Sequence, residues 1–321
     1  MYILSTIKYG IGNKLFILVY LIYLYKNITQ INKIYIVQKK SKFEKELINI
    51  YKIFPNLKKL SWLKFIDWKI YDKLKVQDRK NIINIDANNI SIEELKVQKQ
   101  NIIFTGNMNV TFNSIYFQDY MKKYFTFSSS IQNKIFIKKN LMNEIILIHI
   151  RLGDKLNIVY NNIIKKISNV YIVSIYTPEF YKYCIQQILN KNKKIKYVFI
   201  FTDSSKIVER FYIPLLKSSF QNLHFKIENK KMKNYEIIYI FSIFKYIILS
   251  DSTLTYFGTY LSQVKERIIW NHYYSILSKK KNNYQKNNYI IKKNKDYKYI
   301  KDKTYFLSNH PELIKKFIQY S

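Results

Sequence analysis

Short apolar runs alternate with amphipathic segments from about residue 144 onward. Ile145–Ile150 is a continuous, mostly β-branched run, which is typical of a strand buried on both faces of a parallel sheet. Thr177 and Pro178 indicate a helix over Phe180–Leu189, because threonine is a common N-cap and proline suits the first helical position. The same alternation predicts strands at Tyr197–Phe201, Leu223–Ile227, Tyr246–Leu249 and Arg267–Trp270, and helices at Ser204–Phe211, Tyr235–Phe244 and Thr253–Ser262. Repeated strand–helix units predict a doubly wound α/β sheet.

The N-terminal part begins with the same strand-then-helix order. Tyr2–Ile7 predicts a strand, Gly10-Ile11-Gly12 a tight turn, and Asn13–Lys26 a long apolar helix. Further elements expected in this part are strands at Lys33–Val37 and Ile102–Thr105 and a helix at Ser114–Tyr124.

Two segments do not follow this alternation. Ser41–Gln100 predicts only short helices, with Trp62 and Trp68 in the core or in a cleft. Lys279–Lys303 is a low-complexity Lys/Asn/Tyr segment that predicts a surface extension, and Pro311–Phe317 predicts one short docked helix after it. We therefore expect an N-terminal acceptor-side lobe (1–140), a C-terminal Rossmann-like lobe (141–275) and a lysine-rich extension (276–321).

Composition excludes several classes of protein. Hydrophobic residues make up 48% of the 321 residues, so most of the chain can form a packed core. The single cysteine, Cys184, rules out a disulfide framework and a thiolate metal cluster. The apolar run Leu15–Tyr25 has 11 residues, fewer than the ~20 that span a bilayer. No secretory signal is evident, and we expect a cytoplasmic protein with no membrane span.

The formal net charge of +34 suggests nucleic-acid binding at first sight. However, 51 of the 55 basic residues are lysine, whereas nucleic-acid readers favour the bidentate contacts of arginine. Ile, Lys, Asn, Tyr and Phe dominate the chain, and an A/T-rich genome explains that bias without any partner. We expect no nucleic acid, although a basic nucleic-acid-binding protein remains an alternative because Tyr284, Tyr289, Tyr297 and Tyr299 lie among lysines.

Polar segments follow three of the predicted strands, at the edge where ligands bind open α/β sheets. The first is His149-Ile150-Arg151-Leu152-Gly153-Asp154. Arg151 can hold a diphosphate with two parallel hydrogen bonds, and His149 can donate to, or stack on, a base or ribose. A structural ion pair between Arg151 and Asp154 explains the same residues equally well.

The other two polar segments have similar alternatives. Ser252 and Thr253 fall at a helix N-terminus, where free amides and the helix dipole favour an anion. Asp203, after the strand at Tyr197–Phe201, can accept a hydrogen bond from a base or ribose. Each segment, taken alone, is also explained as a helix cap.

Together with the N-terminal glycines, these segments resemble glycosyltransferase family 11, the α1,2-fucosyltransferases, and more broadly the GDP-fucose-using superfamily. The family's GxGNQLF turn reads Gly10-Ile11-Gly12-Asn13-Lys14-Leu15-Phe16, and its HxRRGD motif reads His149 to Asp154 with Leu152 in place of the second arginine. Its later motifs are matched by Tyr176-Thr177-Pro178-Glu179, by Phe201-Thr202-Asp203-Ser204 and by Asp251 to Leu261, and its central stretch by Thr105-Gly106-Asn107 with Phe117-Gln118-Asp119-Tyr120.

The resemblance implies a GT-B-like fold, with two Rossmann-like lobes of parallel strands around a central cleft. It implies an inverting glycosyltransferase that transfers fucose from GDP-fucose to a hydroxyl of a glycan acceptor, for example a galactose-terminated one, without a metal or other cofactor. A catalytically inactive GDP-sugar-binding homologue is a further alternative. The implied donor-binding residues are Gly12, Asn13, His149, Arg151, Asp203, Ser252 and Thr253.

The resemblance also implies two catalytic residues. Arg151 corresponds to the arginine that holds the β-phosphate of the donor and would stabilise the leaving diphosphate. Asp154 is the nearest carboxylate of the motif and a candidate general base, although an ion pair with Arg151 would make it a weak one.

Overall fold

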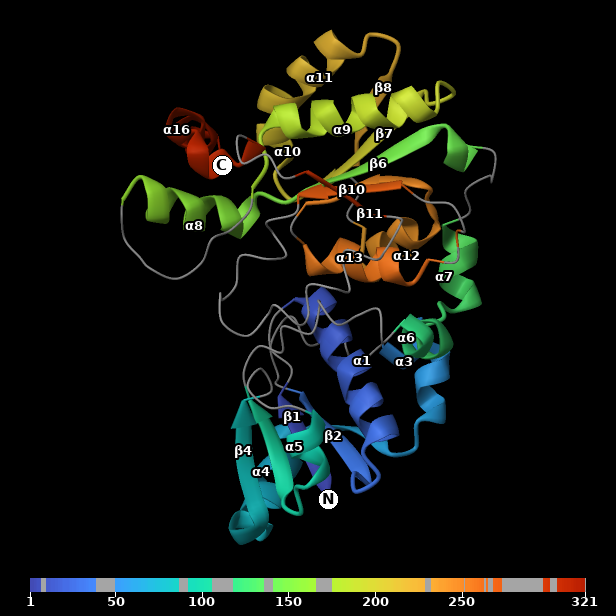
Figure 1. Cartoon of the computed structure of the whole chain (residues 1–321), viewed down its shortest axis with the longest axis vertical. Coiled ribbons are helices and arrows are strands. Elements are labelled where there is room, and N and C mark those ends of the chain that lie inside the picture. Colours follow the sequence, from blue (N-terminus) through green and yellow to red (C-terminus); the bar gives the residue numbers. More distant parts are fainter. Residues whose placement is uncertain are drawn as a thin grey trace. The chain divides into compact units, whose positions relative to one another are not determined.

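The structure is a computed structural model of the chain. It describes residues 1–6, 10–38, 50–86, 92–105, 118–135, 141–165, 175–228, 232–250, 252–262, 264, 268–272, 297–300 and 305–320. Two compact units, Met1–Lys134 and Ile135–Ser321, are each built on a parallel β-sheet (Figure 1). The predicted fold class, α/β with two lobes of parallel strands, is confirmed.

The first unit contains a five-stranded parallel sheet in the order β3-β2-β1-β5-β4. Its strands are β1 (Tyr2–Thr6), β2 (Lys33–Gln38), β3 (Leu63–Asp67), β4 (Ile82–Asp86) and β5 (Asn101–Thr105). Its helices are α1 (Ile11–Asn27), α3 (Ile50–Ile53), α4 (Trp68–Gln77), α5 (Ile92–Lys96), α6 (Gln118–Tyr124) and α7 (Ser129–Lys134), with 3₁₀ turns at Pro55–Lys59 and Arg79–Asn81.

Helix α1 begins earlier than its sequence predicts. Gly10 is the N-cap, so Ile11 and Gly12 form the first turn of the helix rather than a tight turn before it. Most of the helix surface is buried, including Leu15 and Phe16. A helix that is buried almost all round needs few polar positions, which explains the uninterrupted apolar run.

The sequence does not predict β3 and β4, which lie in the segment expected to hold only short helices. Both are edge strands of the sheet, and β3 buries Leu63 and Ile66 while its other positions face solvent or are half-buried. Short edge strands therefore carry too few apolar residues to give a clear pattern. Trp68 does not lie in the core: it is 39% exposed and stacks on Tyr71.

The second unit contains a six-stranded parallel sheet in the order β11-β10-β9-β6-β7-β8. Its strands are β6 (Ile145–Ile150), β7 (Tyr197–Thr202), β8 (His224–Ile227), β9 (Tyr246–Ile248), β10 (Ile268–His272) and β11 (Tyr297–Ile300). Its helical segments are Leu141–Asn143, α8 (Gly153–Ile163), α9 (Pro178–Lys191), α10 (Ser205–Ile207), a π-helical turn at Val208–Tyr212, α11 (Ile213–Ser219), α12 (Asn234–Ile243), α13 (Thr253–Tyr260), Leu307–Asn309 and α16 (Pro311–Gln319).

This strand order places a topological switch point between β6 and β9. From β6 the chain builds outward through β7 and β8, and then crosses to β9, β10 and β11 on the other side. Adjacent helices lead away in opposite directions at such a point, and ligands of open α/β sheets bind in the crevice outside it.

Helices cover both faces of the second sheet, with α9 and α11 on one side and α12 and α13 on the other (Figure 1). Side chains of β6 alternate between them: Ile146, Ile148 and Ile150 belong to the main core cluster, whereas the ring of His149 meets Phe241 of α12. His149 therefore lies on the opposite face of the strand from these isoleucines, between the sheet and the α12–α13 pair.

Gly258 allows α13 to pack closely against α12. A Cβ atom at this position would lie 2.6 Å from the carbonyl oxygen of Ile238 and 2.9 Å from Cβ of Phe241. Any side chain would therefore push the two helices apart.

The C-terminal segment contributes more to the second unit than a surface extension would. The described part includes β11, which pairs in parallel with β10, and the buried residues Phe306 and Leu307. The predicted terminal helix is confirmed as α16, which buries Ile314 and Phe317 in the core. Because these residues form a sheet edge and part of the core, we expect removal of everything after Ser278 to destabilise the unit.

None of the helices among the described residues combines the length and apolar character that a membrane crossing requires.

Candidate functional site

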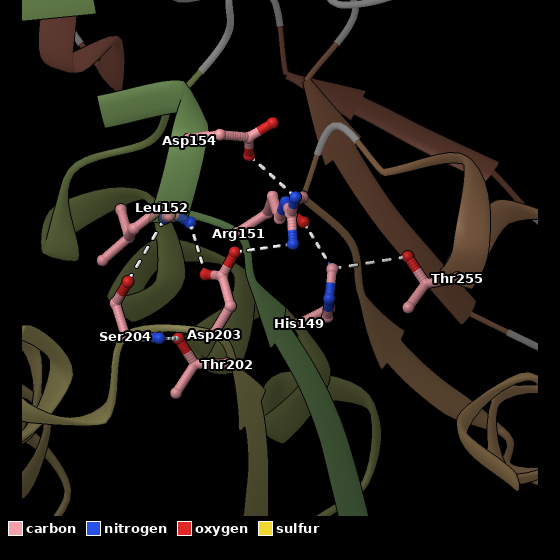
Figure 2. Close-up of polar contacts among 10 residues, drawn as sticks. His149, Arg151, Leu152, Asp154, Thr202, Asp203, Ser204 and Thr255 are labelled. Atoms are coloured by element: carbon pink, nitrogen blue, oxygen red, sulfur yellow. Dashed lines mark hydrogen bonds and ion pairs between the residues drawn. The ribbon is translucent and has the colours of Figure 1, made fainter. Parts of the chain in front are cut away.

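Polar side chains meet at the carboxyl ends of β6, β7 and β9, at the switch point of the second sheet (Figure 2). The sheet register explains this meeting, because His149 pairs with Phe201 and Ile150 with Thr202 across β6 and β7. Arg151 and Asp203 are the next residues along the two strands, so they emerge side by side. The structure thus joins the first predicted polar segment to the second and the third.

Arg151 binds two carboxylates at once. Its Nη1 lies 2.6 Å from Oδ2 of Asp203, and its Nη2 lies 2.7 Å from Oδ1 of Asp154 (Figure 2). The side chain of Arg151 is 37% exposed, that of Asp203 is 26% exposed and that of Asp154 is 69% exposed. The ion pair expected as the structural alternative therefore exists, together with a second, less exposed one.

Asp203 and Ser204 also cap the N-terminus of α8, a helix in a different part of the sequence. Oδ1 of Asp203 accepts a hydrogen bond from the backbone N–H of Leu152 at 2.9 Å, and Oγ of Ser204 accepts one from Gly153 at 3.2 Å. A Cβ atom at Gly153 would collide with the carboxylate of Asp203. The glycine is required here because the carboxylate occupies the space that any side chain would need.

His149 is buried next to two hydroxyl groups. Its Nδ1 lies 2.5 Å from Oγ of Ser250 and 3.5 Å from Oγ1 of Thr255. Burial, with smaller effects from the charges of Arg151 and Lys155, lowers the pKa of His149 from 6.5 to about 3. The imidazole is therefore neutral at physiological pH, and it can offer a hydrogen bond to a ligand but not a positive charge.

Ser252 and Thr253 open α13 beside the histidine. Ser252 is the N-cap, and its side chain makes no capping hydrogen bond within the described residues. Its N–H donates to the carbonyl oxygen of Ser250 at 2.9 Å, and Oγ1 of Thr255 donates to the carbonyl oxygen of Ser252 at 3.3 Å. The first turn of α13 therefore begins at the same sheet edge as Arg151, with the positive end of its dipole there.

Gly12 and Asn13 lie in the other unit, in the first turn of α1. Gly12 is buried and Asn13 is half-buried. Four further residues on which the resemblance depends lie outside the described residues: Gly106, Asn107, Phe117 and Asp251.

The sequence leaves three contributors to the site without a function. Ser250, Thr255 and Ser204 all bond to residues of the first polar segment. A possible signal is position, because Ser250 and Ser204 follow strand ends directly and Thr255 is one helical turn after Ser252. Among the described residues, no group of three or more His, Cys, Asp or Glu side chains is arranged to hold a metal ion.

No protein-family model and no curated protein sequence matches the chain. The chain is similar to several solved structures, among them two fucosyltransferases and one heptosyltransferase. POFUT1 in complex with GDP-fucose is 11% identical with a TM-score of 0.45, over 83% of this chain and 95% of that one. Fucosyltransferase NodZ from Bradyrhizobium is 13% identical with a TM-score of 0.44, over 81% and 93%. The ADP-heptose lipopolysaccharide heptosyltransferase II of E. coli is 12% identical with a TM-score of 0.46, over 99% and 98%. Similarities at this level carry no information on substrate or mechanism.

Proposed function

We propose that the protein is an inverting, metal-independent glycosyltransferase that transfers fucose from GDP-fucose to a hydroxyl of a glycan acceptor, as an α1,2-fucosyltransferase does. One observation carries the proposal: Arg151 and the N-terminus of α13 lie at the same switch-point edge, joined through His149 and its contacts with Ser250 and Thr255. An arginine and a helix N-terminus together make a suitable site for the diphosphate of a nucleotide sugar.

Arg151 has enough donors for this task. A guanidinium carries five N–H groups, and the two carboxylates occupy one at Nη1 and one at Nη2. Over a third of the side chain is exposed. The remaining N–H groups, with the amide of Thr253 at the first position of α13, would bind the phosphate oxygens of the donor.

His149 would complete the donor site as a neutral group. Because its pKa is low, the histidine is neutral and does not attract the phosphates by charge. It is suited to a hydrogen bond with the ribose or base. The preference for GDP and fucose rests on the ordered resemblance of the motifs, which include Gly12 and Asn13 of the first unit.

The proposed chemistry is a single displacement. The acceptor hydroxyl attacks the anomeric carbon on the face opposite the diphosphate, the bond between that carbon and the phosphate oxygen breaks, and the electron pair leaves with GDP. Negative charge on the leaving diphosphate increases in the transition state, and Arg151 with the amides of α13 stabilises it. Asp154 is the proposed acceptor of the hydroxyl proton.

A donor panel tests the proposal. The full chain is incubated in EDTA with GDP-fucose, GDP-mannose, a UDP-sugar and a CMP-sugar, and release of the nucleotide is followed with and without galactose-terminated glycans. Thermal shift with GDP, UDP and CMP measures binding separately, since a ligand at 100 times its Kd stabilises a protein by about 2.7 kcal/mol. We expect GDP to stabilise the protein most and GDP-fucose to turn over.

Each other outcome has a definite meaning. Selective GDP binding without turnover of any donor identifies an inactive GDP-sugar-binding homologue. Equal stabilisation by the three nucleotides, or none by GDP, contradicts the proposed donor. The nucleic-acid alternative relied on four tyrosines that lie among lysines in the sequence. Two of them, Tyr297 and Tyr299, belong to strand β11 and are therefore part of the sheet.

A further inference from the structure

We infer that the two carboxylates on Arg151 have opposite functions. Asp203 is a permanent partner that positions the arginine, whereas Asp154 is an exchangeable partner that the diphosphate of the donor replaces. This inference rests on the proposed function and deepens it, because it states how the arginine changes from its state without ligand to its state with donor.

Asp203 is held from two sides. One carboxylate oxygen accepts the N–H of Leu152 at 2.9 Å, and the other binds Nη1 of Arg151 at 2.6 Å. The absence of a side chain at Gly153 lets the carboxylate lie directly against the start of α8. If Asp203 left the arginine, it would also have to leave the helix N-terminus or adopt a strained position between them.

The chain segment that carries Asp203 is itself fixed. The N–H of Ser204 donates to Oγ1 of Thr202 at 3.1 Å, and Oγ of Ser204 accepts the N–H of Gly153 at 3.2 Å. Two consecutive side chains of the β7 end therefore bind two consecutive amides of the β6–α8 connection. Asp203 is thus a rigid support that keeps the guanidinium at the switch point.

Asp154 is held much less firmly. Among the described residues, one of its oxygens accepts a hydrogen bond from Nη2 of Arg151, three positions earlier in the chain, and its side chain is 69% exposed. Exposed ion pairs of this kind contribute little, because solvent screens them and both side chains lose rotamer freedom. A diphosphate carries more charge and can bind the guanidinium bidentately, so it competes well for the same N–H groups.

Exchange of Asp154 for the diphosphate also makes the charge around Arg151 more favourable for the donor. With both carboxylates in place, the negative charges of Asp154 and Asp203 oppose the attraction of Arg151 for a diphosphate. When Asp154 rotates away, one of these two opposing charges leaves the guanidinium, and the attraction increases. The released carboxylate is no longer bound to Arg151, so both of its oxygens become available to accept the hydroxyl proton of the acceptor.

The opposite signs expected for two matched variants test the inference. GDP and ADP binding to the full chain is measured by calorimetry at low ionic strength for the wild type, Asp154→Asn and Asp203→Asn. We expect Asp154→Asn to tighten GDP binding about two- to fivefold, as loss of a competing surface pair predicts. We expect Asp203→Asn to weaken binding of both nucleotides about tenfold or more, because Arg151 loses its fixed partner.

Asp67→Ala is the control for helix capping. It removes the side-chain acceptor at the N-terminus of α4 in the first unit, so it should lower the melting temperature but leave the GDP affinity close to that of the wild type. Asp203→Asn keeps an oxygen for the N–H of Leu152. If that variant does not fold, Asp203→Glu, which retains the charge, takes its place, and we expect it to bind GDP less tightly than the wild type does.

A double-mutant cycle separates positioning from direct readout of the base. If Asp203 acts through Arg151, its substitution should have little further effect in an Arg151→Gln background. Additive effects, or weaker binding of GDP with unchanged binding of ADP, would show that Asp203 contacts the base and would overturn the positioning role. Unchanged or weaker GDP binding by Asp154→Asn would overturn the exchange. A wild-type protein that binds neither nucleotide contradicts the proposed function itself, whereas wild-type binding with equal responses of the two variants contradicts this inference alone.

Discussion

Asp67 in the first unit and Asp203 in the second cap helices at the ends of parallel strands, yet only one of them does more than that. Oδ1 of Asp67 accepts the N–H of Ile70 at 2.9 Å, three residues later in its own helix α4. Oδ1 of Asp203 accepts an N–H at the same distance from Leu152, 51 residues away, and its other oxygen binds Arg151. A local cap stabilises one helix, whereas a distant cap ties two strand ends together and can hold a functional group in place.

The two aspartates differ because different groups surround them at the carboxyl edges of the two sheets. The fold is similar in both units, so it does not by itself confer chemistry. In the second unit the carboxyl edge joins a cation, a buried neutral histidine and a helix N-terminus. The capping aspartate there, Asp203, also binds the cation Arg151, and four experiments test whether its role differs from that of Asp67.

The largest effect is expected when Arg151, the cation that Asp203 binds, is replaced. Arg151→Lys keeps the charge but not the planar fork that binds two oxygens at once. We expect GDP-fucose turnover to fall about 10²- to 10³-fold, by analogy with loss of an oxyanion donor, while the circular dichroism spectrum stays that of the wild type. Arg210→Lys is the matched control, because Arg210 stacks on Tyr320 and does not belong to the site. Wild-type turnover by Arg151→Lys would show that the arginine is structural.

Glycine substitutions test whether the space beside Asp203 affects GDP binding as well as stability, in contrast to the space beside other glycines. Gly153→Ala forces a Cβ into the carboxylate of Asp203, and we expect a loss of about 1–3 kcal/mol in unfolding free energy together with weaker GDP binding. Gly258→Ala strains the α12–α13 contact and should cost a similar amount with GDP binding retained. Gly10→Ala, in open space at the start of α1, should cost at most about 1 kcal/mol. Urea unfolding and calorimetry measure both quantities, and equal GDP affinity of the three variants would contradict the role of Gly153.

The buried histidine should make stability depend on pH. Its folded-state pKa of about 3 is below the ordinary value of 6.5, so the unfolded chain binds one more proton between these values. The contribution of His149 to the unfolding free energy is therefore fully present above about pH 6.5. It decreases as the pH is lowered toward 3, by ~1.4 kcal/mol per pH unit. Urea unfolding at pH 7.5 and pH 5 should differ by about 2 kcal/mol in the wild type, and by less in His149→Asn. His224→Asn, at an exposed position of β8, is the control, and an equal difference in the His149 variant would disprove the assignment.

The smallest effect is expected at the local cap. Asp67→Ala removes the acceptor for Ile70 and should cost about 0.5–2 kcal/mol of unfolding free energy, with no change in GDP affinity. Ser204→Ala should have an effect of similar size on stability. A change in GDP affinity on substitution of Asp67 would show that the first unit's cap also acts on the donor site.

The sequence by itself determined the strongly patterned elements. Strand β6 has the predicted bounds because its short, mostly β-branched run favours a buried strand, and α9 begins at the predicted Pro178 because proline pre-sets the helical φ. It did not determine β3, β4 or β11, which are edge strands in segments of weak or low-complexity pattern. The hydrophobic pattern of a strand reflects its burial, and β3 and β4 have too few buried side chains to give a clear pattern.

Only the tertiary structure decided which polar residues contact one another. Taken alone, the segments of Arg151, Asp203 and Ser252 each had a helix cap or an ion pair as an alternative explanation, and in the sequence only the resemblance grouped them. The parallel register of β6 and β7 places Arg151 beside Asp203, and the switch between β6 and β9 places His149 beside Ser250, 101 residues away. Such contacts depend on strand pairing across the whole unit, and strand pairing is set by the packing of the complete core rather than by the residues next to each site.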